Sequence, residues 1–204
     1  MLKNYIFDLG GVILDIRMQN AYERFLALGL PAAELEKAGQ TYKLMEDYQL
    51  GFVSTQIFCE QVAGKCDSAT PLDIEKAWNS ICLGVAERKL DTLRRLRQTE
   101  NVTVSLLSNT NELHWECCCK NWFNANGNRL DDFFGHVFLS QELHLQKPDP
   151  EIFMTAIRML DADPSETVFI DDNAENTAAA AACGLQTLCV TPGVDWVNSI
   201  MSGV

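Results

Sequence analysis

Three aspartates stand where apolar runs of the sequence end. Asp8 closes the run 4–8 (NYIFD), and Asp171 and Asp172 follow the run 167–170 (TVFI). Carboxylates placed together repel one another, and they persist mainly where a metal ion neutralises them or where one is kept protonated. Carboxylate oxygens, completed by water and phosphate oxygens, suit Mg²⁺. The three aspartates therefore predict a Mg²⁺ site.

A hydroxyl, an amide and a lysine follow two further apolar runs. Ser108 and Asn109 come directly after the run 102–107 (VTVSLL), and Lys147 lies beyond a weaker run at 136–139. A lysine beside several carboxylates offsets their repulsion and could hold an anionic substrate, because opposite charges attract strongly where water is scarce. Lys147 is therefore a candidate for binding an anion near the aspartates.

Strands and helices are expected to alternate in the second half of the chain. The expected strands cover residues 4–8, 102–107, 136–139, 167–170 and 185–190. Helical stretches such as 151–160 and 175–182 lie between them. The alternation predicts an α/β fold with a Rossmann-like parallel sheet and helices on both faces. Ligands bind such sheets outside the carboxyl ends of the strands, so the candidate side chains should converge at one edge.

Taken one at a time, these residues have ordinary structural interpretations. Asp8 at a strand end resembles a turn residue, Asp172 or Asn173 could cap a helix, and Lys147 could be a surface lysine. Independent loops have no reason to place these residue types at successive strand ends. The joint pattern therefore favours a functional site.

The segment 16–86 has a different character. It contains helical-period segments at 18–28, 33–46, 55–62 and 71–81, with no convincing strand. It is predicted to be a small helical cap inserted into a core of residues 1–15 and 87–204. Tyr42, Met45 and Tyr48 could face a cleft and select a substrate, but packing inside the cap is the favoured interpretation.

Four segments, in this order, resemble the motifs of the haloacid dehalogenase superfamily, in the subfamily with a helical cap between the first two motifs. They are Phe7 to Val12 (FDLGGV), Leu107 to Thr110 (LSNT), Lys147 to Phe153 (KPDPEIF) and Phe169 to Asn173 (FIDDN). The resemblance covers essentially the whole chain. The combined pattern is similar to bacterial alpha-glucose-1-phosphate phosphatases, and the later motifs resemble the N-terminal phosphatase domain of soluble epoxide hydrolases.

The resemblance implies a Mg²⁺-dependent phosphatase with an aspartyl-phosphate intermediate. Asp8 would attack phosphorus, and water would hydrolyse the intermediate. The implied metal ligands are Asp8, the Gly10 carbonyl and Asp172, with Asp171 as an outer or alternative ligand. The implied phosphoryl-binding groups are Ser108, the Asn109 backbone amide and Lys147.

Gly10 departs from the family pattern. The family's phosphatases usually carry there a second aspartate, which acts as general acid and base. General acid-base catalysis contributes about 10²- to 10⁴-fold, so its loss weighs most on poor leaving groups. A sugar 1-phosphate, with its better leaving group, is therefore the predicted substrate.

Two alternative functions stay open. One is a metal-independent dehalogenase of the haloacid type, although that chemistry has no use for the pair Asp171 and Asp172. The other is a weakened phosphate-binding or regulatory protein, because Gly10 transfers no proton.

The composition of the chain excludes some classes of binding partner. The chain has 204 residues, 47% of them hydrophobic, and a formal net charge of −12. This charge repels nucleic acid and anionic membranes, so a small phosphorylated molecule is the expected partner. Eight cysteines without a secretory pattern or zinc spacing point to a reducing cytoplasm. The histidines lack partner spacing for zinc or a triad and are expected to be structural. The oligomeric state is not predicted.

Overall fold

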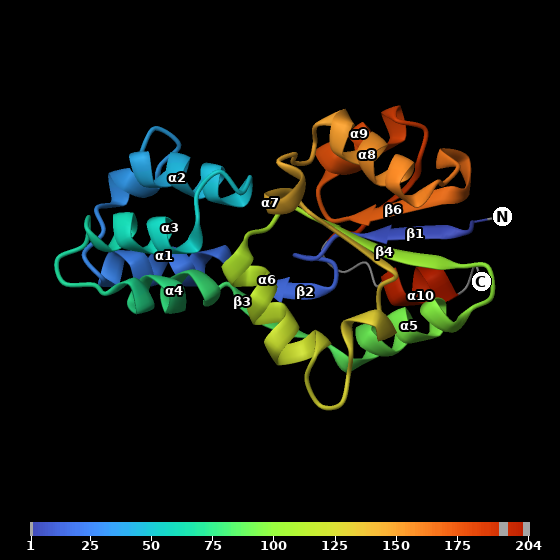
Figure 1. The fold of residues 1–204 in the computed structure, drawn as a ribbon, viewed down its shortest axis with the longest axis horizontal. Helices are drawn as coiled ribbons and strands as arrows, with labels where there is room; N and C mark the ends of the chain where they lie inside the picture. The colour runs from blue at the N-terminus through green and yellow to red at the C-terminus, as the bar shows by residue number, and fades with distance from the viewer. Residues whose placement is uncertain (1, 192–195, 202–204) are drawn as a thin grey trace.

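The computed structural model describes residues 2–191 and 196–201 and contains one parallel five-stranded sheet (Figure 1). The strand order is β5-β4-β1-β6-β7, which places β1 in the centre. The strands are β1 (Asn4–Phe7), β4 (Thr103–Ser108), β5 (His136–Leu139), β6 (Thr167–Asp171) and β7 (Gln186–Cys189). Each run expected from the sequence is a strand, and the predicted Rossmann-like α/β fold is confirmed. Within the predicted core, residues 192–195 and 202–204 lie outside the described residues.

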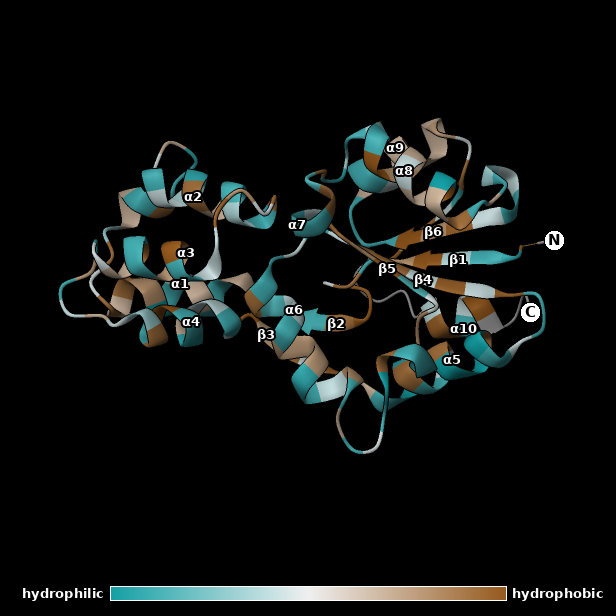
Figure 2. Cartoon of the chain, viewed as in Figure 1, coloured by the Kyte–Doolittle hydropathy of each residue, from teal (hydrophilic) through white to brown (hydrophobic). Residues whose placement is uncertain are grey.

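Helices cover both faces of the sheet (Figure 1). One face carries α8 (Pro150–Leu160) and α9 (Ala174–Ala182), and the other carries α5 (Glu87–Gln98) and α10 (Trp196–Met201). Phe153 packs edge-to-face on Phe169 with ring centroids 5.2 Å apart, and Trp196 packs on Phe7 at 5.1 Å. Figure 2 shows hydrophobic residues concentrated on the strands between these layers. Burial on both faces is the reason that the strands are continuous apolar runs rather than alternating ones.

Four further helices lie beside the sheet, and we call them the cap helices (Figure 1). They are α1 (Met18–Ala27), α2 (Gln40–Gln49), α3 (Thr55–Ala63) and α4 (Pro71–Asn79). A separate hydrophobic cluster that includes Phe25, Phe58 and Trp78 holds them together. Each helix buries one apolar face in this cluster, as the helical spacing in the sequence predicts.

Two short antiparallel strands join the cap helices to the rest of the chain, and they were not expected from the sequence. β2 (Leu14–Ile16) pairs antiparallel with β3 (Cys82–Val85), so the expectation of no strand in 16–86 is wrong. The two strands have three and four residues and are mostly exposed or half-buried, so no alternating pattern develops in the sequence. The chain enters the cap helices after β2 and leaves them through β3.

The helix predicted at 33–46 is wrong in its first half. A 3₁₀ turn (Ala32–Leu35) comes first, and α2 begins only at Gln40. The Glu34 carboxylate accepts hydrogen bonds from the backbone N–H and the hydroxyl of Thr41, each at 3.0 Å, and pairs with the Lys65 ammonium at 2.6 Å. It therefore satisfies a backbone donor at the start of α2 from outside the helix.

The carboxyl end of α2 connects the cap helices to α6 (Glu112–Cys118) and α7 (Ser140–Leu143). The Ser140 hydroxyl accepts from the backbone N–H of Thr110 at 2.9 Å and lies 2.7 Å from the carbonyl oxygen of Gln49. The Tyr48 hydroxyl accepts from the backbone N–H of Leu113 at 3.1 Å. Tyr48 is thus buried and packed at this contact, as expected.

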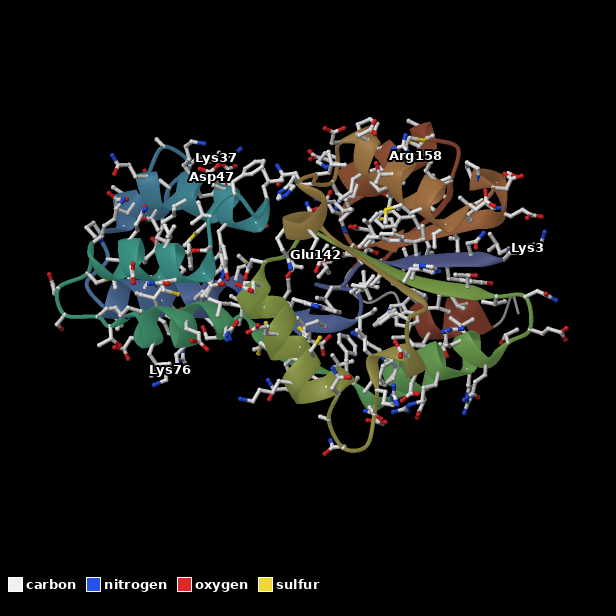
Figure 3. All side chains as sticks on the ribbon, in the orientation of Figure 1. Lys3, Lys37, Asp47, Lys76, Glu142 and Arg158 are labelled. Atoms are coloured by element: carbon white, nitrogen blue, oxygen red, sulfur yellow. The ribbon has the colours of Figure 1, made fainter. Side chains whose placement is uncertain are left out.

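Charged side chains lie on the outside of both parts. Figure 3 shows Lys37, Lys76 and Arg158 at the periphery, pointing away from the hydrophobic interior. Within the described residues, no helix has the length and apolar character needed to cross a membrane. The acidic excess is therefore mainly a property of the surface, and the buried carboxylates are the exception to explain.

Two buried serines provide a matched test of the contact between α2 and α7. Ser140→Ala should lower the free energy of unfolding by about 1–3 kcal/mol, because the buried N–H of Thr110 loses its acceptor. Ser105→Ala should be neutral or stabilising, because the Ser105 hydroxyl is buried without a hydrogen-bond partner. Urea denaturation of both variants measures the difference. Equal losses would contradict the assigned role of Ser140.

Candidate active site

The three aspartates identified in the sequence meet at the carboxyl edge of the sheet. Asp8 follows β1, Asp171 ends β6 and Asp172 comes next. One carboxylate oxygen of each lies within 4.8 Å of those of the other two. Asp8 and Asp171 are buried, whereas Asp172 is exposed. The parallel pairing of β1 and β6 continues into this edge, because the backbone N–H of Asp8 donates to the carbonyl of Ile170 at 2.8 Å.

Lys147 lies between two of these carboxylates. Its ammonium donates to Asp8 Oδ1 at 2.7 Å, to Asp171 Oδ2 at 2.8 Å and to the carbonyl oxygen of Leu107 at 3.0 Å. The side chain is only 1% exposed, and its nitrogen lies 5.2 Å from the centroid of the Phe169 ring. All three N–H groups are engaged, so a phosphoryl oxygen would have to share one of them. The expected contact of Lys147 with phosphate therefore stays a prediction.

Two asparagines fix Asp171 from another side. The backbone N–H of Asn173 donates to Oδ1 at 2.8 Å, and the Asn176 amide lies 3.2 and 3.1 Å from the two carboxylate oxygens. These bonds, with that of Lys147, use both oxygens of Asp171. Hydrogen bonds from three groups compensate for the complete burial of this carboxylate.

The pKa values of Asp8 and Asp172 are raised, in part because negative charge is in excess at the site. Burial raises the pKa of Asp8 to about 6, the Lys147 ammonium opposes this rise, and the Asp171 carboxylate adds to it. The pKa of Asp172 is also raised, first by partial desolvation of its carboxylate and then by Asp171. One ammonium is thus too little to stabilise three carboxylates fully.

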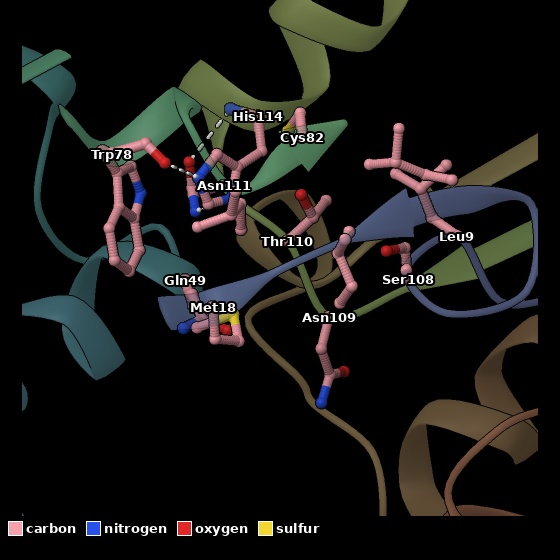
Figure 4. A pocket seen from close by; sticks show the side chains of 14 residues that line it. Leu9, Met18, Gln49, Trp78, Cys82, Ser108, Asn109, Thr110, Asn111 and His114 are labelled. Carbon is pink, nitrogen blue, oxygen red and sulfur yellow. Dashed lines mark hydrogen bonds between the residues drawn. The ribbon is translucent and has the colours of Figure 1, made fainter. Parts of the chain in front are cut away.

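Asn109 joins the loop after β4 to the loop that carries Lys147. Its amide donates to the Lys147 carbonyl, and its side-chain oxygen accepts from the Lys147 backbone N–H, each at 2.8 Å. Ser108 is buried at the end of β4. Both residues line a pocket of about 120 Å³ that also contacts Gly10 and Trp78 (Figure 4). Residues from the sheet edge and from the cap helices therefore meet in one pocket.

Two glycines after β1 have different surroundings. Gly11 has a φ of +79°, and a Cβ at this position would collide with the Asp172 carboxylate. A Cβ at Gly10 would meet only Ile16, whose Cδ1 would lie 3.2 Å away. Glycine at position 11 therefore allows Asp172 to approach the other carboxylates. Position 10 has room for a small side chain if Ile16 shifts slightly.

This donor set fits Mg²⁺. Three carboxylates face one ammonium, and a divalent cation would neutralise the remaining charge. Asp8 and Asp172 would supply carboxylate oxygens to the ion, with the Gly10 carbonyl as a further oxygen donor. Asp171 suits an outer position, because both of its oxygens already accept hydrogen bonds. The assignment of Asp8, Gly10, Asp172 and Asp171 as metal ligands stays a prediction.

His114 borders the pocket as a structural residue. Its ring nitrogens lie 3.0 Å from the Asn111 amide and 3.1 Å from the Trp78 carbonyl oxygen, and the ring stacks on the Trp78 indole at 4.8 Å. Burial lowers the pKa of His114 to about 4. The neutral ring therefore links α6 to α4.

Three residues of the site were missed in the sequence. Asn176 lies in the first turn of α9, and its spacing from Asp171 was an available signal. Gly11, the second glycine of a pair after a strand, gave a weaker one. Trp78 gave none, because it reaches the pocket from the cap helices.

Comparison with known proteins agrees with this geometry. The family model described as haloacid dehalogenase-like hydrolase matches residues 2–184. D-ribitol-5-phosphate phosphatase of Bacteroides thetaiotaomicron is 36% identical over 199 residues, which cover 96% of this chain and 95% of that protein.

Solved structures extend the comparison. A haloacid dehalogenase family enzyme of Bacteroides thetaiotaomicron, crystallised with magnesium and inorganic phosphate, has a TM-score of 0.89 and 32% identity, covering 98% of this chain and 99% of that one. A 2-haloacid dehalogenase of Pseudomonas syringae has a TM-score of 0.61 and 18% identity, covering 96% of this chain and 90% of that one. The second likeness shows a shared fold alone.

Gly11→Ala tests the packing of Asp172. The new Cβ should displace the Asp172 carboxylate and weaken Mg²⁺ binding by about tenfold or more, measured by isothermal titration calorimetry. Gly127→Ala is the matched control, because Gly127 has a similar φ of +85° with nothing within 4 Å of a Cβ. Both variants carry a similar backbone strain, and only the first disturbs the site. Unchanged Mg²⁺ affinity in Gly11→Ala would contradict this role.

Proposed function

The chain belongs to the haloacid dehalogenase-like hydrolases, a family of enzymes, and from this membership we propose that it is a Mg²⁺-dependent phosphomonoester hydrolase. One observation carries the proposal: a buried carboxylate, Asp8, is held by Lys147 at 2.7 Å beside Asp171 and Asp172. The phosphatase name of the Bacteroides relative and the magnesium and phosphate bound by the similar crystal structure support it. The substrate is a small phosphorylated molecule.

Asp8 is the proposed nucleophile. Its carboxylate oxygen forms a bond to phosphorus while the bond from phosphorus to the alcohol oxygen breaks. A water molecule then attacks the aspartyl-phosphate, which releases phosphate and restores the carboxylate. The bond from Lys147 to Oδ1 orients the carboxylate, so that the other oxygen is directed to the substrate.

Three groups are proposed to hold the phosphoryl oxygens: Ser108, the Asn109 backbone amide and Lys147. Bound Mg²⁺, held by Asp8, Asp172 and the Gly10 carbonyl, would offset the repulsion between Asp8 and a phosphate dianion.

We further propose that residues 16–86 are a cap that closes over the substrate and excludes bulk water.

The eight free cysteines support a cytoplasmic location, where thiols stay reduced.

The alcohol must leave without a proton from Gly10, so water is the proposed proton donor. Asp15 does not replace the missing acid, because it pairs with the Lys89 ammonium at 2.8 Å and its side chain is 60% exposed. A leaving group of low basicity is therefore favoured, and a sugar 1-phosphate remains the predicted substrate. The relative named for D-ribitol 5-phosphate points to a primary phosphate ester in that protein, so the comparison of the two ester types is decisive.

Asp8→Asn should lower the turnover of p-nitrophenyl phosphate by about 10⁴-fold or more, because the amide cannot attack phosphorus. The fold should persist, since the change removes one of three mutually repelling carboxylates; thermal unfolding measures this. Chelation of divalent ions should abolish wild-type activity. Full activity of the variant would reject Asp8 as the nucleophile, and turnover of p-nitrophenyl phosphate that survives chelation would contradict the proposed Mg²⁺ dependence.

Gly10→Asp tests the missing proton donor. The wild type should hydrolyse glucose 1-phosphate faster than glucose 6-phosphate, and the new carboxyl group should raise kcat for the 6-phosphate by about 10²-fold. Ile16 is 36% exposed and can shift to admit the side chain. Gly10→Asn, of equal size without the acid, should give no gain. Equal wild-type rates on the two esters would reject the sugar 1-phosphate prediction.

A further inference from the structure

A second cavity lies among the cap helices, next to the pocket at the sheet edge. Its volume is about 350 Å³, against about 120 Å³ for the pocket that contains Ser108 and Gly10. Met18, Gln49 and Trp78 line both spaces. A phosphate ester bound at the sheet edge would therefore extend its leaving group past these three side chains into the cap cavity.

The lining of the cap cavity is mainly apolar and aromatic, with a few polar groups. Tyr22, Phe25, Tyr42 and Met45 are among its apolar and aromatic side chains, Gln19 and Gln49 provide amides, and Glu46 provides a carboxylate. Tyr42 and Met45 thus border the cavity, and Met45 is also buried in the hydrophobic cluster of the cap helices, as expected. At its mouth, Met18 is 57% exposed and Tyr22 40% exposed. Large apolar side chains exposed beside a pocket indicate contact with a ligand.

The charged groups that line the pocket and the cap cavity are negative and not positive. Among the described residues that line them, no lysine or arginine occurs, and Glu46 contributes a carboxylate. His114 is neutral, because burial lowers its pKa to about 4. A leaving group with its own carboxylate or second phosphate would meet no cation here and would be repelled by Glu46. The cavity therefore suits an uncharged leaving group.

Trp78 adds a directional requirement. Its indole N–H is buried and has no hydrogen-bond partner. Figure 4 shows the indole at the edge of the pocket, with its nitrogen on the side of the other lining residues. The stack on His114 and the contacts with Phe25 and Phe58 hold the ring in this position. Buried donors are nearly always paired, so this N–H calls for an acceptor on a ligand.

We propose that Trp78 selects the leaving group of the substrate, and that this group is an uncharged, hydroxylated carbon skeleton of five or six carbons. A hydroxyl oxygen accepts from the Trp78 indole, while the C–H surface packs on Met18, Tyr22 and Tyr42. The volume admits such a group, because a cavity of about 150 Å³ holds a benzene ring and this one is larger. The assignment rests on the proposed phosphatase activity and specifies its substrate class.

The hydroxyl requirement is tested with ribitol 5-phosphate and pentyl phosphate, which have equal carbon number. The wild type should show a higher kcat/KM for ribitol 5-phosphate. Trp78→Phe keeps an aromatic ring and removes the N–H, so the ratio of the two kcat/KM values should fall about fivefold, the value of one ordinary hydrogen bond. Trp122→Phe, a half-buried tryptophan outside both spaces, should leave the ratio unchanged. An unchanged ratio in Trp78→Phe would overturn the assignment.

The charge requirement is tested in the wild type, so it does not depend on the folding of a variant. Glucose 6-phosphate should be hydrolysed with a kcat/KM at least tenfold above that of 6-phosphogluconate, which has a carboxylate at the far end. Equal values would overturn the uncharged leaving group. Turnover of p-nitrophenyl phosphate with Mg²⁺ is measured in parallel. Its absence would reject the proposed phosphatase itself, whereas its presence with no preference in either arm would reject only the substrate class.

Discussion

The repulsion among three carboxylates at one sheet edge is the constraint on which the rest of the site depends. Asp8, Asp171 and Asp172 have oxygens within 4.8 Å of one another, two of these residues are buried, and one ammonium lies among them. Such a group is unfavourable unless further positive charge or hydrogen bonding compensates for it. Lys147 and Asn176 supply part of that compensation, Asn109 fixes the Lys147 loop, and Gly11 leaves room for Asp172. A divalent cation and a phosphate ester would complete the arrangement.

The fold supplies the compensation through backbone geometry. Parallel strands β1, β4 and β6 end at the same edge, so Asp8, Ser108 and Asp171 meet although they lie far apart in the sequence. Asn109 fixes the Lys147 loop by two hydrogen bonds of 2.8 Å, and Lys147 in turn fixes Asp8. The buried sheet behind them excludes water, which strengthens these electrostatic contacts. The catalytic geometry is thus a consequence of strand order and loop pairing.

The cap helices add what the sheet lacks. They have their own hydrophobic cluster, and they reach the sheet edge through the carboxyl end of α2 and through Trp78 and His114. The sheet edge holds the three carboxylates and Lys147, whereas the lining of the cap cavity is mainly apolar and aromatic, with Glu46 and with no lysine or arginine among its described residues. This division separates two tasks. Under the proposed function, the sheet edge supports chemistry common to phosphate esters, and the cap helices discriminate among leaving groups.

The sequence by itself determined the strands, the fold class and the residues at the sheet edge, because buried parallel strands are apolar runs and their ends carry the polar chemistry. It did not determine the pairing of β2 with β3, whose strands are too short for an alternating hydrophobic pattern. It also did not determine the late start of α2, which depends on Glu34. Only the tertiary structure decided that Lys147 binds two aspartates, that Gly11 makes room for Asp172, and that Trp78 borders the pocket. These are contacts between segments distant in the chain, and local residue patterns carry no information about which side chains such segments bring together.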